Sequence, residues 1–354
     1  MTPSTDAGNH WLLYAMGGGM GHITRATALS RGLLRLSSDG SSRGDDRITL
    51  LTNSSFADGL PIENELGPRA EVIRIESKLS RDETVDEVQR VLTTTTWTAV
   101  IVDTFPRGIA GELAGILPRI NCPKVLVHRD LNPKYCQKFR LAEFVTLYDR
   151  LVVPGEAALF ENHPHAISTP PWLVRNAEEL LTPDDARCRL VAKQNTLPVA
   201  VVLGCGRDDE IEQMHGWAMR LADEFTGKLE VRFIVMKKPD FLGDREKKLP
   251  NFKMVSIWPF FEAVRGASIL ISGGGYNSVN ESKAAGIPFC GVPRKRLYDR
   301  QENRLSSHDC VERYDELRSR VERIVLKSST QFNAPISFRN GVQEAVVAIQ
   351  SVVD

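Results

Sequence analysis

The sequence predicts an α/β protein with two domains, each built on a parallel sheet with crossover helices. Three observations lead to this prediction: short apolar segments alternate with helical segments, glycine-rich turns follow two of the apolar segments, and the chain is long. The alternation is typical of repeated strand–helix–strand units. A chain of 354 residues exceeds the usual size of a single α/β core, so about two domains are expected.

The expected elements follow in chain order. Apolar runs predict strands at 11–16, 47–52, 70–75, 98–103, 124–128 and 150–153, and then at 198–203, 229–236, 252–257, 267–271 and 287–292. Helical patterns lie between several of these strands, as at 82–92 and 107–117, and one amphipathic helix is expected at 338–353. The segment 168–189 carries turn and helix-cap signals and is the expected interdomain linker. The Ser/Gly/Asp-rich segment 37–46 is expected to be a loop.

The first glycine-rich turn, Gly17-Gly18-Gly19, follows the strand at 11–16 and leads to Gly21-His22. A dinucleotide-binding fingerprint starting here would require glycine or alanine at position 22. A phosphate-binding P-loop would require lysine at that position. Because neither pattern fits, the turn is interpreted as holding a histidine at the start of a helix.

The second glycine-rich turn, Gly273-Gly274-Gly275, follows the strand at 267–271 and leads into a helix that carries Glu281. Glycine there lets backbone N–H groups approach a ligand, and a helix N-terminus carries partial positive charge, so the turn suits a diphosphate. A carboxylate one turn into the helix can accept hydrogen bonds from a ribose diol. A tight strand–helix turn would also favour glycine, which is the structural alternative to a nucleotide site.

The stretch 272–303, including Asp299-Arg300-Gln301-Glu302, resembles the nucleotide-sugar donor site of glycosyltransferases with the GT-B fold. The closest resemblance is to family 28, which includes the N-acetylglucosaminyltransferase that makes the peptidoglycan lipid precursor. The resemblance implies two Rossmann-like domains facing across a cleft: an acceptor-side domain at 1–170, a donor domain at 190–335, and a final helix at 336–354 that returns to the first. The donor-binding residues that it implies are Gly21, Arg207, Ile257, Gly274, Gly275, Asn277, Ser278, Glu281, Gln301 and Glu302.

The first glycine-rich turn resembles the Gly-Gly-His loop on the acceptor side of the same enzymes. The resemblance implies that His22 is the catalytic base and that Asp103, at the end of the strand 98–103, orients it. A helix cap is the alternative role for Asp103. Family 28 usually has proline where Arg25 stands, which leaves the acceptor class open.

These residues together predict transfer of a sugar from a nucleotide diphosphate donor, expected to be a UDP-sugar, to an acceptor hydroxyl. Inversion is expected because position 273 is glycine, where retaining enzymes of this fold usually have the first of two glutamates. The sequence has no Asp-x-Asp pair, so no metal and no cofactor beyond the co-substrate is expected. A UDP-N-acetylglucosamine 2-epimerase and a noncatalytic nucleotide-sugar binding protein are the alternatives.

Composition narrows the possible partners and the compartment. The 45 basic and 45 acidic side chains give zero formal net charge, so no nucleic-acid partner is expected. The polar N-terminus, the absence of a long apolar run and six scattered cysteines favour a cytoplasmic protein with reduced thiols. The acceptor is either soluble or lipid-linked; for the second case Lys134, Lys138 and Arg140 are candidate contacts for peripheral docking on a membrane.

Overall fold

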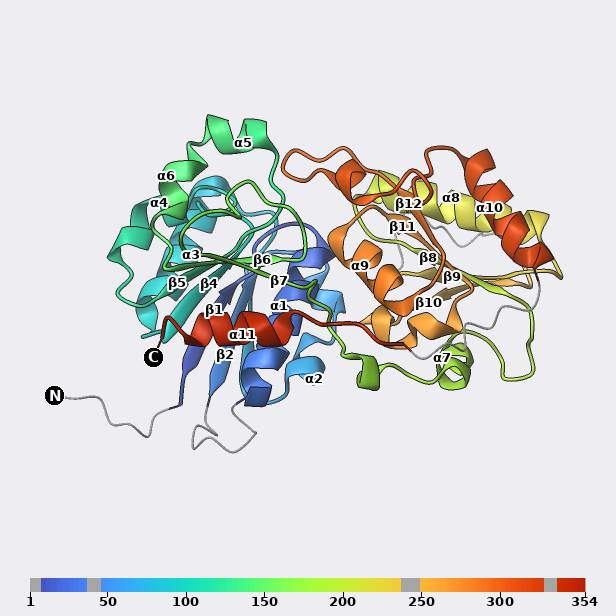
Figure 1. Cartoon of the computed structure of the whole chain (residues 1–354), viewed down its shortest axis with the longest axis horizontal. Coiled ribbons are helices and arrows are strands. Elements are labelled where there is room, and N and C mark those ends of the chain that lie inside the picture. The colour runs from blue at the N-terminus through green and yellow to red at the C-terminus, as the bar shows by residue number, and fades with distance from the viewer. Residues whose placement is uncertain (1–7, 37–45, 237–248, 328–335, 354) are drawn as a thin grey trace. The chain divides into compact units, whose positions relative to one another are not determined.

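The structure is a computed structural model that describes residues 8–36, 46–236, 249–327 and 336–353. The expectations for the first seven residues and for the loop at 37–45 lie outside these residues. The chain divides into two compact units (Figure 1). Unit 1 comprises residues 1–174, 297–299 and 339–354, and unit 2 comprises residues 175–296 and 300–338.

Unit 1 is built on a parallel sheet to which its described residues contribute seven strands, in the order β3-β2-β1-β4-β5-β6-β7. Successive side chains of a strand point to opposite faces, and every residue of β4 is buried, so both faces of the sheet are covered there. The strands are β1 (His10–Tyr14), β2 (Arg47–Thr52), β3 (Ala70–Arg74), β4 (Ala99–Asp103), β5 (Lys124–Val127), β6 (Arg150–Pro154) and β7 (Ala166–Thr169).

The helix that follows the first glycine-rich turn is α1 (Met20–Leu36), and it packs against α11 (Val342–Gln350) near the carboxyl end of the chain (Figure 1). A Cβ atom on Gly32 would lie 2.5 Å from Cγ1 of Val342, so glycine permits the close approach of the two helices. The other helices of unit 1 are α2 (Ile62–Leu66), α3 (Arg81–Thr94), α4 (Leu113–Ile116), α5 (Pro133–Lys138) and α6 (Leu141–Val145).

Unit 2 is built on a smaller parallel sheet, to which its described residues contribute five strands in the order β10-β9-β8-β11-β12. The strands are β8 (Val199–Leu203), β9 (Glu230–Ile234), β10 (Phe252–Val255), β11 (Ile269–Gly273) and β12 (Phe289–Val292). The helices are α7 (Pro183–Leu190), α8 (Asp208–Glu224), α9 (Tyr276–Ala285) and α10 (Tyr314–Leu326).

Both sheets reverse their strand order once, and these reversals place the candidate sites. In unit 1 the chain builds outward from β1 through β2 to β3 and then returns to the other side of β1 with β4. In unit 2 it builds from β8 to β10 and then returns beside β8 with β11. Open α/β sheets bind ligands at the carboxyl ends of the strands beside such a reversal. The two glycine-rich turns follow β1 and β11, at these positions.

The predicted α/β class with two parallel sheets is confirmed, and the eleven expected strands all occur, with ends displaced by two residues at most. The half-buried edge strand β7 was not predicted, because its mixed sequence Ala-Ile-Ser-Thr lacks an apolar run. The helix expected at 107–117 is wrong: only α4 and a 3-10 turn form. Gly108 and Gly111 have positive φ values of 81° and 89°, which interrupt a helix. No helix of the described residues has the length and hydropathy required to cross a membrane.

Candidate functional site

The first glycine-rich turn brings the ring of His22 against the backbone that follows β1. Gly17 has a φ of +142°, and its N–H donates to the side-chain oxygen of Asn53 over 2.8 Å. A Cβ atom on Gly17 would lie 2.7 Å from Cδ2 and Nε2 of His22. Glycine is therefore needed at this position both for its backbone conformation and for the space that the imidazole occupies.

His22 is hydrogen-bonded to Asp103, the last residue of β4. Its Nδ1 atom lies 2.5 Å from Oδ2 of the carboxylate, and the two side chains are 16% and 7% exposed. Because an ionised carboxylate can only accept, the hydrogen is assigned to Nδ1 and the lone pair to Nε2. No described residue shares a hydrogen bond with Nε2. That nitrogen is therefore free to accept a proton from a ligand.

Arg25, one turn after His22 on α1, completes the contacts of the same carboxylate. Its Nε donates to Oδ1 of Asp103 over 3.1 Å and its Nη2 donates to Oδ2 over 2.7 Å, a bidentate geometry. Nη2 also donates to Oγ1 of Thr104 over 3.3 Å. Arg25 is 3% exposed. The sequence marked Arg25 only as a departure from the family pattern, and nothing in that pattern indicated its partner.

The backbone directly after Asp103 is strained. Thr104 has a φ of +73°, a conformation that is costly for a β-branched residue, on the order of 1–3 kcal/mol. Its N–H donates to the carbonyl of Val127 over 3.0 Å, and the N–H of Phe105 donates to the carbonyl of Asp103 over 2.9 Å. Together with the Arg25 bond, these contacts hold the end of β4 in one conformation. Stored strain of this kind is concentrated at functional sites.

The charges around His22 oppose one another. Burial raises the pKa of Asp103, but the Arg25 and His22 charges outweigh it and hold that pKa well below its usual range. Burial lowers the pKa of His22; the bond to Asp103 raises it, and the Arg25 and Arg129 charges lower it again, so the net direction is downward. The imidazole is therefore neutral at neutral pH, as a proton acceptor must be.

One aromatic ring contacts this histidine, and two further aromatic rings extend from it. The ring of Phe105 lies 5.5 Å from that of His22, measured between centroids. Tyr298, in the segment 297–299 that belongs to unit 1, contacts Phe105 edge-on at 5.1 Å and Tyr135 at 4.6 Å. The carbonyl of Tyr298 also accepts a hydrogen bond of 2.8 Å from the N–H of Asn132.

The run His128-Arg129-Asp130 follows β5 at the same edge of the sheet. His128 is completely buried, and its Nε2 accepts from the N–H of Phe160 over 3.0 Å. Burial lowers the pKa of His128 to about 4, so it stays neutral. Arg129 makes a bidentate ion pair with Glu156, at 2.6 and 3.2 Å. These two side chains support the loop rather than offer a second base.

The second glycine-rich turn lies between β11 and α9 in unit 2. Gly275 occupies the N-cap position, and no side chain caps the helix there. A Cβ on Gly275 would meet no atom within 4 Å, so the backbone is open on that side. Ser278 is buried, and its hydroxyl accepts from Ser272 over 3.0 Å, whereas Asn277 is half-buried. The glycine N-cap therefore supplies no side-chain cap to the backbone N–H groups at the positive end of the helix.

Glu281 is a buried carboxylate without a hydrogen-bond donor among the described residues. It is 8% exposed, and burial alone raises its pKa to about 7. Its charge acts on the Cys205 thiol, which follows the neighbouring strand β8. An ionisable group left in this state costs free energy unless a ligand supplies the missing donors.

Gln301 lies beside the second glycine-rich turn, at the start of the 3-10 turn η5 (Gln301–Arg304). It is 7% exposed, and its Oε1 accepts from the N–H of Arg294 over 3.1 Å. A Cβ on Gly274 would lie 3.2 Å from its Cβ. Glu302, the next residue of this turn, is exposed.

Arg294, which follows β12, lies beside this site: a Cβ atom on Gly273 would be 4.0 Å from its Cγ. Arg207 is exposed, and its backbone N–H donates to Glu210 over 2.9 Å. Glu210 in turn binds Arg296, with Nη2 to Oε2 at 2.6 Å. Arg294 binds Gln213, and its Nη2 is buried with no hydrogen-bond partner in the part of the chain that the structure describes. The basic run Arg294-Lys295-Arg296 after β12 could have indicated both Arg294 and Arg296 from the sequence.

Two further residues of the expected donor set belong to other segments of the chain. Gly21 is the second residue of α1 in unit 1. Ile257 is half-buried between β10 and the 3-10 segment Phe260–Gly266. Among the described residues, no group of three or more His, Cys, Asp or Glu side chains is placed to hold a metal ion.

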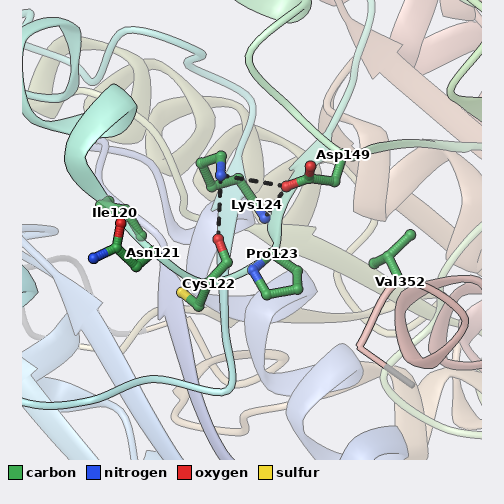
Figure 2. A pocket seen from close by; sticks show the side chains of 7 residues that line it. All are labelled: Ile120, Asn121, Cys122, Pro123, Lys124, Asp149 and Val352. Carbon is green, nitrogen blue, oxygen red and sulfur yellow. Dashed lines mark hydrogen bonds and ion pairs between the residues drawn. The ribbon is translucent and has the colours of Figure 1, made fainter.

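Figure 2 shows a hollow at the opposite edge of the unit 1 sheet. It measures about 550 Å³ and lies around Lys124 and Asp149, at the amino ends of β5 and β6. Lys124 Nζ is already engaged there by the Cys122 carbonyl at 3.2 Å and by Asp149 at 3.4 Å. Ligands of parallel sheets bind at the other ends of the strands, so this hollow is not the candidate site.

Comparisons with known proteins give a fold rather than a family. No protein-family model matches the chain, and no curated protein matches it in sequence. Among solved structures, the glycotransferase of kitacinnamycin is similar, with 14% identity, a TM-score of 0.61, and 98% of this chain and 100% of that chain covered. A UDP-glucosyltransferase from Polygonum tinctorium that glucosylates indoxyl has 13% identity, a TM-score of 0.59 and 99% of each chain covered.

The UDP-GlcNAc 2-epimerase from Neisseria meningitidis, solved with UDP-GlcNAc bound, has 13% identity and a TM-score of 0.63, with 97% of this chain and 98% of that chain covered. These matches extend over almost the whole chain, and at this identity they establish the architecture. The protein therefore has the two-sheet α/β fold of the GT-B glycosyltransferases, a fold in which a UDP-GlcNAc 2-epimerase is also found.

Proposed function

We propose that the protein is a glycosyltransferase that moves a sugar from a nucleotide diphosphate donor, with UDP the first choice, to an acceptor hydroxyl. The observation that carries the proposal is Glu281, a buried carboxylate with no donor among the described residues, on a helix whose N-cap residue is a glycine. A ribose diol supplies the donors that Glu281 lacks, and a diphosphate supplies the negative charge that the helix N-terminus attracts.

In this proposal the donor occupies the carboxyl edge of the unit 2 sheet. Backbone N–H groups around Gly274, Gly275, Asn277 and Ser278 bind the diphosphate, and Gln301 and Glu302 bind the sugar hydroxyls. Arg294 neutralises phosphate charge with the nitrogen that has no hydrogen-bond partner among the described residues, and Arg207 reaches the outer phosphate from solvent. The backbone at Ile257 borders the base, and Gly21 borders the sugar from the acceptor side.

Transfer proceeds by direct displacement at the anomeric carbon. The acceptor oxygen forms a bond to that carbon while its proton passes to Nε2 of His22. The bond between the anomeric carbon and the phosphate oxygen breaks, and its electron pair leaves with the nucleoside diphosphate. Asp103 holds the ring and stabilises the imidazolium that forms. One displacement inverts the anomeric configuration, and no step requires a metal ion.

The donor part of the proposal is tested by thermal unfolding against a panel of UDP-, dTDP- and GDP-sugars. A ligand that binds only the folded protein raises the unfolding temperature, and UDP-sugars should raise it most. The transfer part is tested by release of nucleoside diphosphate that depends on an added acceptor. A panel without any shift at millimolar concentration would contradict the nucleotide site.

A 2-epimerase is the second candidate, because a solved structure of such an enzyme shares the fold over 97% of this chain. The two reactions differ in a simple way: an epimerase needs no acceptor and acts on the sugar carbon next to the anomeric one. Incubation with UDP-GlcNAc in heavy water separates them. Deuterium at that carbon without an acceptor indicates epimerisation, whereas its absence together with acceptor-dependent release indicates transfer.

We further propose that the protein is cytoplasmic and that its acceptor is either soluble or linked to a membrane lipid. A lipid-linked acceptor would bring the α5 region to a membrane, where Lys138 lies 5.4 Å from the ring of Phe139 and Phe139 is 37% exposed. Arg140 is already paired with Glu143 at 2.5 Å, which weakens the attraction. Flotation with anionic vesicles at low salt distinguishes the two acceptors: bound protein supports a lipid-linked acceptor and unbound protein a soluble one.

A further inference from the structure

We propose that Arg25 is a positioning residue of the active site, so that the working unit is a His22–Asp103–Arg25 triad in which Arg25 keeps the base unprotonated. The inference rests on the proposed function only in that His22 is named as the base. Its geometric part concerns the free protein and is tested without any substrate.

The first step is the geometry of the carboxylate. Each oxygen of Asp103 accepts from a different nitrogen of Arg25, at 3.1 and 2.7 Å, and Oδ2 also accepts from His22 at 2.5 Å. The guanidinium is planar and rigid, so two bonds to it fix both the position and the rotation of the carboxylate plane. The direction of the imidazole follows from that plane. Arg25 thereby determines where Nε2 points.

The second step is charge. A buried His–Asp pair without a further partner favours the ion pair, in which the imidazole is protonated and cannot accept a proton. Arg25 already supplies the positive charge that the carboxylate requires. Its Nη2 lies 3.4 Å from Nδ1 of His22, so the positive charge of the guanidinium lies directly beside the ring and disfavours a second positive charge on the imidazole. His22 thus stays neutral beside the ionised Asp103 carboxylate.

The other groups that face His22 act in a consistent way. Arg129, after β5, contributes a further positive charge that lowers the pKa of His22. Phe105, after β4, offers an apolar ring at 5.5 Å and no charge. On the amino side the ring meets the backbone of Gly17, and Asp103 is the one group named here that favours protonation. Arg25 is therefore the group whose removal shifts the balance most directly.

The third step is the strained backbone. Nη2 of Arg25 also donates to Thr104, whose φ is +73°. The same side chain thus holds the carboxylate and the strained residue that follows it. A salt bridge needed only for stability would require no bond to this turn.

The test is the pKa of His22 in the free protein, measured by NMR titration of histidine ring signals, with His22→Gln identifying the His22 signal. Arg25→Met removes the charge and keeps an apolar stem of similar length. The His22 pKa should rise by about one unit or more, because Asp103 is then free to favour imidazolium. Arg25→Lys keeps a charge without the rigid fork and should give a smaller rise.

The double variant Arg25→Met/Asp103→Asn is the matched control for folding, because it removes both buried charges and leaves no unpaired ion. Its His22 pKa should fall to the wild-type value or below. If Arg25→Met unfolds, comparison of Arg25→Lys with Asp103→Asn still decides, since the first should raise the His22 pKa and the second lower it. An unchanged pKa in a folded Arg25→Met or Arg25→Lys variant would overturn the proposal and leave Arg25 a structural residue.

Once an acceptor is identified, the pH profile gives an independent readout. In Arg25→Lys the acidic limb of kcat should move to higher pH, while KM for the donor stays unchanged. Failure of glycosyl transfer altogether would reject the proposed function and leave the NMR result standing. An NMR result without a shift would reject the triad and leave the transfer reaction standing.

Discussion

Asp103 in unit 1 and Glu281 in unit 2 are equally buried carboxylates with opposite surroundings. They are 5% and 8% exposed. Asp103 accepts hydrogen bonds from His22 and from two nitrogens of Arg25, and these charges hold its pKa well below its usual range. Glu281 accepts none from the described residues, and burial raises its pKa to about 7. Donors from the protein thus satisfy the Asp103 carboxylate, whereas the described residues provide no donor for the Glu281 carboxylate.

The difference indicates two roles. A carboxylate that is saturated by protein donors can orient a neighbour, but it has little capacity left for a ligand. A buried carboxylate without donors destabilises the free protein, and a ligand that brings hydroxyl groups recovers that free energy. Asp103 therefore fits the part of an orienting group for a base, and Glu281 that of a ligand-binding group.

The largest expected effect is on the base that Asp103 orients. His22→Ala should lower turnover by roughly 10²–10⁴-fold, because general base catalysis contributes that much. The nucleotide affinity should stay unchanged, since His22 is in unit 1 and the donor residues are mainly in unit 2. Steady-state kinetics with an identified acceptor measures the first quantity and calorimetry the second. The exposed His308→Ala is the control. A His22→Ala variant with most of its activity would assign the base elsewhere, with the buried Asp130 the next candidate.

The next largest expected effect is the loss of stability when the Asp103 carboxylate is removed. Asp103→Ala leaves Arg25 buried, at 3% exposed, without this counter-ion, which should lower the free energy of unfolding by about 3–5 kcal/mol. Denaturant unfolding followed by circular dichroism measures it. The exposed pair Arg90–Glu87 provides the comparison, and Glu87→Ala should change stability by less than about 1 kcal/mol. Equal effects of the two substitutions would contradict the buried triad.

Removing the charge of Glu281 is expected to have the opposite effect, an increase in the stability of the protein. The folded-state pKa of Glu281, about 7, lies above its ordinary value of 4.5. The unfolded chain therefore loses this proton first, and Glu281 reduces stability increasingly between about pH 4.5 and 7. Glu281→Gln should be more stable than the wild type by roughly 3 kcal/mol at pH 8, with little gain at pH 4.5. Glu302→Gln, at an exposed position, should show no such pH dependence. Lower stability of Glu281→Gln at pH 8 would indicate that the wild-type carboxylate has donors in solution.

The smallest expected effect is a proton released when nucleotide binds. Hydroxyl donors from a ribose favour the ionised form of Glu281, so its pKa should fall on binding. Near pH 6.5 the wild type should then release up to about three quarters of a proton, the fraction of Glu281 protonated at a pKa of about 7, and affinity should increase from pH 5 to 7. Calorimetry in buffers with different ionisation enthalpies measures the release. The same experiment on Glu281→Gln should show none, and equal release from both proteins would assign the proton to another group.

The fold could be predicted because strands buried on both faces are apolar throughout, as in β4, whereas the half-polar edge strand β7 gave no such signal. The helix expected at 107–117 failed for a tertiary reason. The N–H of Ile109 donates to the hydroxyl of Tyr14 over 3.0 Å, and that hydroxyl donates to the buried Glu112 carboxylate, so contacts across 95 and 98 residues organise the segment as a loop. A helical pattern in the sequence does not register such long-range competition.

The candidate site was predictable to the extent that its residues follow strands or glycine-rich turns. Position in the sequence could nominate His22, Asp103 and Glu281, and their roles stay predictions. It could not assign Arg25 to Asp103, because that bond joins α1 to β4 across 78 residues. Nor could it distinguish a saturated from an open carboxylate, since that depends on the side chains packed around each one. Arg294 was missed for the same reason.

We propose that the hydroxyl groups of a bound nucleotide supply the hydrogen-bond donors that the Glu281 carboxylate lacks among the described residues. The most direct measurement is the dissociation constant of UDP for the wild type and for Glu281→Ala, determined by calorimetry at pH 8. The account predicts measurable binding by the wild type and a loss of about 1–3 kcal/mol, roughly 5- to 150-fold, in the variant, with its fold intact. Equal affinity in the two proteins, or no binding of any nucleoside diphosphate by the wild type, would contradict it.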